Sequence, residues 1–126
     1  DVAFPVESDD LWAVVTLSPL GYAHDKATRT ITARLAMVDV GRARILTIPG
    51  EALPNIGAYL KRKSGDDTFL FGLTNDAFGY ILTEIDFLAF PRYQYVSRVS
   101  LGERTGSILV DNLLEMVRET PRPGTK

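Results

Sequence analysis

Two residues have types and positions that suit chemistry at the end of a β-sheet. Glu51 directly follows a strand-like run that ends at Pro49-Gly50, and Tyr80 ends the segment GLTNDAFGY, which begins as a second strand-like run ends. If the two strands are parallel neighbours, both side chains lie at the same sheet edge, where α/β folds bind ligands. There Glu51 would serve as a metal ligand or a base. The alternatives are an acid in a helix first turn for Glu51, and a core or interface tyrosine for Tyr80.

The residue counts exclude several kinds of site. The chain of 126 residues has no cysteine, which excludes disulfides, Cys-ligated zinc and cysteine nucleophiles. It has one histidine, His24, whereas most catalytic zinc sites use two or three. A complete site of that kind cannot be built from this chain alone, and His24 is expected to be a solvated loop residue.

Charge and hydropathy exclude other partners. The net charge is -2 and there is no basic stripe, so nucleic acid is not an expected partner. No apolar run approaches the ~20 residues that span a bilayer, so no transmembrane segment is expected. The chain shows no signal peptide and begins with Asp, which leaves its localisation open.

The pattern predicts a single domain over residues 1–126. The expected fold is α/β, with α+β as the alternative: a mixed β-sheet with two main helices packed on it. Alternating or continuous apolar runs predict strands, helical spacing predicts helices, and residues 39–42 predict a hairpin turn. The expected strands are 11–17, 30–38, 43–48 and 68–73; the expected helices are 51–63, 82–90 and 105–119; segment 92–99 is irregular or extended, 1–10 an extended arm and 120–126 a flexible tail.

Several short motifs together resemble the neutral (alkaline, non-lysosomal) ceramidase family. They are Pro49-Gly50-Glu51 after a strand, Gly72-Leu73-Thr74-Asn75 after the next strand, and then Gly79-Tyr80-Ile81. A tyrosine follows at Tyr93 or Tyr95, and Ser100-Leu101-Gly102 precedes the last helix. The resemblance runs from about residue 30 to 118 and covers the C-terminal part of the family's catalytic domain.

The resemblance implies a zinc-dependent amidase acting on N-acyl lipids such as ceramide. It implies that Glu51 and Tyr80 are metal ligands and that Pro49, Gly50, Asn75 and Gly79 shape the loops that present them. It also makes Tyr93 and Tyr95 candidate pocket residues. The two histidine ligands belong to a preceding segment that this chain lacks. A secreted or membrane-associated localisation is implied as well.

Two functions therefore stay open. In the first, the chain is a segment of a zinc amidase, inactive alone, whose partner is the His-bearing N-terminal segment and whose substrate is a lipid amide. In the second, it is a stand-alone, non-catalytic domain that binds another protein or forms a homo-oligomer. The aromatic residues expected in the core are Phe69, Phe71, Phe78 and Phe87. If the first half of the enzyme is absent, some of them would instead form an exposed patch that a partner would cover.

Overall fold

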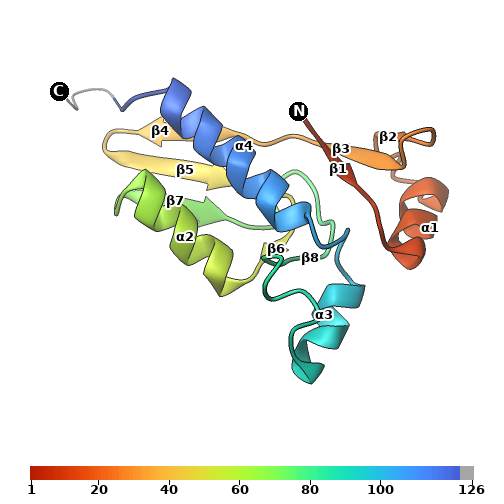
Figure 1. Cartoon of the computed structure of the whole chain (residues 1–126). Coiled ribbons are helices and arrows are strands. Elements are labelled where there is room, and N and C mark those ends of the chain that lie inside the picture. Colours follow the sequence, from red (N-terminus) through yellow and green to blue (C-terminus); the bar gives the residue numbers. More distant parts are fainter. Residues whose placement is uncertain (123–126) are drawn as a thin grey trace.

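The computed structural model describes residues 1–122 and arranges them around three small sheets (Figure 1). In the described part of the chain, the sheet orders are β1-β3-β2, β4-β5-β7 and β6-β8. The elements are β1 (Val2–Pro5), α1 (Asp9–Leu17), β2 (His24–Asp25), β3 (Thr30–Ala33), β4 (Met37–Val40), β5 (Ala43–Thr47), β6 (Glu51–Ala52), α2 (Pro54–Ser64), β7 (Thr68–Phe71), β8 (Tyr80–Ile81), the 3-10 helix η1 (Pro91–Tyr93), α3 (Gln94–Arg98) and α4 (Thr105–Glu119).

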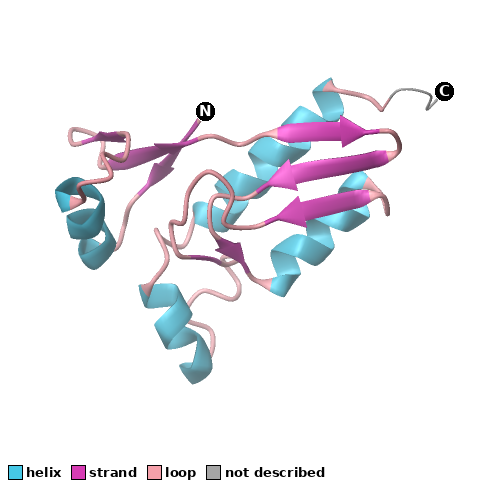
Figure 2. Ribbon diagram, turned by 180° about the vertical axis from the view of Figure 1, so that it is seen from behind, coloured by secondary structure: helices cyan, strands magenta, loops and turns pink. Residues whose placement is uncertain are grey.

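The predicted α/β architecture is confirmed, because a mixed sheet carries the two main helices. Strand β5 pairs antiparallel with β4 and parallel with β7, and α2 makes the crossover between β5 and β7. Helices α2 and α4 lie together on one face of this sheet, as Figure 2 shows from the open side.

The core lies between this sheet and its two helices. Leu46 of β5, Leu60 of α2 and Leu109 and Leu113 of α4 are each fully buried. Apolar residues at helical spacing, among them Leu109, Leu113 and Met116, predicted helix α4 with its observed bounds, Thr105–Glu119. In the described residues, no helix has the length and apolar character needed to cross a bilayer.

Residues 11–17, predicted as a buried strand, instead belong to helix α1. The Ser8 hydroxyl caps the helix by accepting a hydrogen bond from the Leu11 amide at 3.3 Å. Of this apolar run only Val15 is buried, and Leu17 is 82% exposed. A short apolar run does not show whether its hydrophobic period is that of a helix or of a strand. The Ser8 cap and the tertiary contacts therefore determine which of the two forms.

Three other segments differ from prediction. Residues 30–38 form two strands in different sheets, β3 and β4, while the β4–β5 hairpin is as predicted. Residues 82–90 form turns, because Thr83 and Asp86 bond to each other and Leu88 adopts φ +55. Segment 92–99, predicted as irregular or extended, is mostly helical, in η1 and α3.

The two ends of the described chain are held by contacts. Residues 2–5 of the predicted arm form a strand paired with β3, and Phe4 is fully buried, whereas Asp9 and Asp10 already belong to α1. In the predicted tail, the Arg122 guanidinium donates to Thr68 Oγ1 at 2.9 Å. Residues 123–126 of that tail lie outside the described part.

The predicted aromatic core is only partly correct. Phe78 is buried and Phe87 is partly buried, but Phe69 and Phe71 of β7 are each 51% exposed. They are exposed because they point away from the face that α2 and α4 cover.

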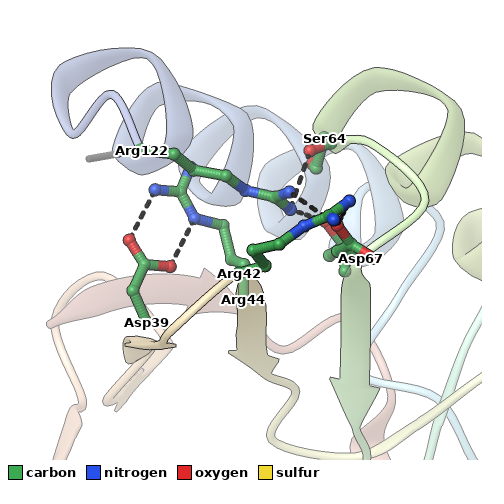
Figure 3. A network of polar contacts seen from close by, with 7 residues as sticks. Asp39, Arg42, Arg44, Ser64, Asp67 and Arg122 are labelled. Atoms are coloured by element: carbon green, nitrogen blue, oxygen red, sulfur yellow. Dashed lines mark hydrogen bonds and ion pairs between the residues drawn. The ribbon is translucent and has the colours of Figure 1, made fainter. Parts of the chain in front are cut away.

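A buried arginine ties the sheet to the end of α4 (Figure 3). Arg44 of β5 is 2% exposed and donates two hydrogen bonds of 2.7 Å to the Asp39 carboxylate across the β4–β5 hairpin. It also donates to the Thr120 carbonyl at 2.7 Å. The charge is therefore buried with a bidentate partner, which such a group requires.

This pair makes stability depend on pH. The hydrogen bonds and charge of Arg44 hold the pKa of Asp39 below its ordinary value of 3.8. Because the folded-state pKa is depressed, the stabilisation is present above the ordinary value and is lost as pH falls through the folded-state pKa. Asp39→Asn should lower the free energy of unfolding at neutral pH, and the gap to the wild type should shrink in acid.

Urea unfolding at a series of pH values measures this gap. Asp111→Asn, which changes an exposed acid in the middle of α4, is the matched control and should lower the free energy of unfolding much less than Asp39→Asn does at neutral pH. A constant gap between Asp39→Asn and the wild type at all pH values would contradict the assignment.

Candidate functional site

Glu51 and Tyr80 are brought side by side by a short parallel pair of strands. In the β6–β8 pairing Glu51 is the register partner of Tyr80, and Ala52 that of Ile81. Neighbouring strands lie about 4.8 Å apart, and register partners project from the same face. Two residues 29 positions apart in sequence therefore present a carboxylate and a phenol from adjacent backbone positions.

The loops before these two strands are joined by backbone hydrogen bonds. The Phe78 amide donates to the Pro49 carbonyl at 2.9 Å, and the Glu51 amide donates to the Gly79 carbonyl at 2.9 Å. On the far side, the Tyr80 amide donates to the Val99 carbonyl at 2.8 Å. Tyr80 is thus held between the Glu51 strand and the segment that follows α3.

Glycines permit this close approach. A Cβ at Gly50 would lie 2.6 Å from the Gly79 carbonyl oxygen, closer than any side chain tolerates. Gly79 itself has φ +78, and a Cβ there would overlap the Val99 carbonyl. These two positions, named from sequence as loop-shaping, need glycine for a steric reason.

Glu51 is not part of the following helix. Helix α2 begins at Pro54 after Leu53 at the N-cap, and its first turn contains no acid. Glu51 is instead an exposed residue of β6. The alternative reading of Glu51 as an acid in the first turn of that helix is therefore wrong.

Of the candidate pocket tyrosines, Tyr95 lies beside Tyr80. Their ring centroids are 6.0 Å apart at an interplanar angle of 67°, an edge-to-face contact that orients the Tyr80 ring. Tyr95 remains 65% exposed. The Tyr93 ring contacts Phe90 instead, with centroids 5.6 Å apart.

The described residues do not form a complete metal site. Residues 1–122 contain no group of three or more His, Cys, Asp or Glu side chains placed to hold a metal ion. His24 belongs to β2 in another sheet, is partly buried, and donates from Nδ1 to the Tyr22 carbonyl at 2.8 Å. The prediction of a solvated loop residue is therefore wrong. A carboxylate and a phenol are both oxygen donors, so Glu51 and Tyr80 could contribute at most two ligands to a four-coordinate zinc ion, and the other ligands would have to come from elsewhere.

The sequence pattern did not single out one partly buried carboxylate that lies outside this pair, Asp76. Asp76 lines a groove of about 720 Å³ between the β2–β3 region and the loop before β8, together with Asn75 and Arg34. Burial raises the pKa of Asp76 above its ordinary value. Asn75 has φ +71 and donates from Nδ2 to the Arg34 carbonyl at 3.3 Å, so it shapes this loop. The available signal in the sequence was the Asn75-Asp76 pair in the loop that follows a predicted strand.

The glycine geometry predicts unequal costs for two similar substitutions. Gly41→Ala, in the β4–β5 turn, meets no atom within 4 Å and should cost only the left-handed strain, about 1–2 kcal/mol. Gly79→Ala adds the overlap with Val99 and should cost about 3 kcal/mol or more of unfolding free energy. Urea denaturation of both variants checks this difference, and equal costs would show that the loops relax freely.

No protein-family model, no curated protein and no solved structure matches the chain. What these residues do must therefore be inferred from their chemistry and their placement.

Proposed function

We propose that this chain is a segment of a zinc-dependent amidase that hydrolyses N-acyl lipids of the ceramide type. The observation that carries the proposal is the register pairing of Glu51 with Tyr80 across β6 and β8. It gives the two residues matched by the ceramidase-like motifs a shared face.

In this proposal Glu51 and Tyr80 hold the metal through oxygen atoms. Both side chains are accessible to a ligand, since Glu51 is exposed and Tyr80 is partly buried. The contact with Tyr95 limits the orientations of the Tyr80 ring before a metal binds. Preorganisation of this kind reduces the entropy lost on binding.

Zinc, when bound, would supply Lewis acidity toward an amide carbonyl and lower the pKa of bound water. The remaining ligands would be histidines from a segment that precedes the described residues in the complete enzyme. Because two accessible ligands hold zinc weakly and enclose no substrate, the isolated chain should be inactive.

The first test is the size of the native polypeptide, measured by immunoblot of source cells with an antibody against this chain. A band far above 13.9 kDa is expected. The larger polypeptide is then purified, and its zinc content and ceramide hydrolysis are measured. A native band at 13.9 kDa, with no His-bearing second chain attached, would contradict the proposal.

In that polypeptide, Glu51→Gln and Tyr80→Phe should each lower zinc content and reduce hydrolysis at least about a hundredfold, since metal sites lose this much even when only a supporting residue changes. The matched controls are Glu115→Gln on the exposed side of α4 and Tyr59→Phe on α2. They should retain zinc and activity. Full zinc content and activity in Glu51→Gln would rule out the ligand assignment.

The alternative function is a non-catalytic interaction or self-assembly domain. The exposure of Phe69 and Phe71 on β7 favours it, because aromatic residues on an open sheet face are typical of a surface that another chain covers. The two functions are compatible if the catalytic segment also self-associates.

A further inference from the structure

A second, smaller groove lies between the N-terminal halves of α2 and α4 and the turn of residues 83–86 that follows β8. The two helices lie side by side (Figure 1). The groove has a volume of about 310 Å³. Small-molecule sites in proteins have volumes of about 300–1,000 Å³. This groove is at the lower end of that range, which suits a single slender molecule.

Hydrogen bonds fasten the turn to both helices, so the groove is formed before any ligand binds. The buried Asp86 carboxylate accepts from Asn55 Nδ2 of α2 and from Thr83 Oγ1, each at 2.8 Å. On the other side, Ser107 Oγ of α4 donates to Glu84 Oε1 at 2.7 Å. A preformed site loses less entropy on binding than a flexible one does.

The walls of the groove are mainly apolar. Ile56 of α2 is buried, Val110 of α4 is partly buried, and Ile85 of the turn is 88% exposed. Gly106 lets the turn approach α4 closely, since a Cβ there would overlap the Leu82 carbonyl. An alkyl chain lying against these walls would be removed from water, which is favourable for apolar surface.

The charged groups of the lining are both negative. They are the exposed carboxylates of Glu84 and Asp111, and no basic side chain of residues 1–122 lines the groove. Arg62 and Lys63 lie over the ring of Tyr59 at the α2 side of the groove, outside the lining. Apolar walls that carry carboxylates are complementary to an alkyl chain that ends in a cation.

We propose that this groove binds a long-chain primary amine. The alkyl chain lies against the apolar walls, and the ammonium group pairs with Glu84 and Asp111. A fatty acid would bring a third carboxylate to the two that are present. An apolar protein segment would bury both without a counter-charge, which is costly. The inference does not rest on the proposed amidase activity, although hydrolysis of an N-acyl lipid of the ceramide type releases an amine of this class.

NMR titration of this chain with octylamine, octan-1-ol and octanoate tests the proposal, because these ligands share a chain length and differ in charge. Each is kept below the concentration at which it self-associates. The signals of residues 83–86 and 106–111 should shift. The amine should bind at least about fivefold more tightly than the alcohol, and octanoate should bind most weakly. Added salt should reduce the advantage of the amine, since exposed charges are screened. Octylamine should bind up to about tenfold more tightly than hexylamine, because two more methylene groups leave water.

Single substitutions separate the two parts of the site. Glu84→Gln and Asp111→Asn should each weaken octylamine binding about twofold or more and leave octan-1-ol binding unchanged. Unchanged alcohol binding also shows that the groove has kept its shape. Ile85→Ser, at a highly exposed position, should weaken the binding of both ligands. The matched control is Glu115→Gln, an exposed acid about one turn further along α4 and outside this groove, which should bind octylamine like the wild type.

Four results would each overturn the proposal. They are no binding of octylamine, equal binding of the amine and the alcohol, tightest binding of octanoate, and an effect of Glu115→Gln as large as that of Glu84→Gln. Shifts confined to other parts of the chain would overturn it as well. None of these outcomes bears on the Glu51–Tyr80 site, which is tested separately by zinc content.

Discussion

The candidate site depends on a run of parallel backbone hydrogen bonds between residues 47–53 and 71–81. It continues the β5–β7 pairing just past the end of β5, where the Ile48 amide donates to the Phe71 carbonyl at 2.8 Å. It resumes in β6–β8 and ends where the Leu53 amide donates to the Ile81 carbonyl at 2.9 Å. Because parallel strands lie at a set spacing and register, this run places Glu51 opposite Tyr80.

A second constraint is that both main helices lie on the same face of the sheet. This arrangement buries the α4 stripe and lets Arg44 reach the Thr120 carbonyl. It also leaves the opposite face of the β4-β5-β7 sheet, which carries Phe69 and Phe71, uncovered by the described residues. The Glu51–Tyr80 pair lies in the β6-β8 sheet, whereas this open face belongs to the β4-β5-β7 sheet.

Prediction from sequence worked where the local pattern and the tertiary environment agreed. Helix α4 has a long, unbroken stripe and was predicted with its observed bounds. The apolar run 11–17 was too short to show its period, and the Ser8 cap made it helical. Phe69 and Phe71 were placed in the core because hydrophobicity alone does not say which face of a strand is covered.

The sequence by itself determined the α/β class, the two main helices, the hairpin, and the chemical types available at positions 51 and 80. It also excluded cysteine chemistry and a histidine-only metal site, because those residues are absent or too few. Only the tertiary structure decided that Glu51 pairs with Tyr80, that Asp76 lines a groove, and which face of the sheet stays open. The register between distant strands and the order of the layers are settled by long-range contacts, which a local hydrophobic pattern restricts but does not fix by itself.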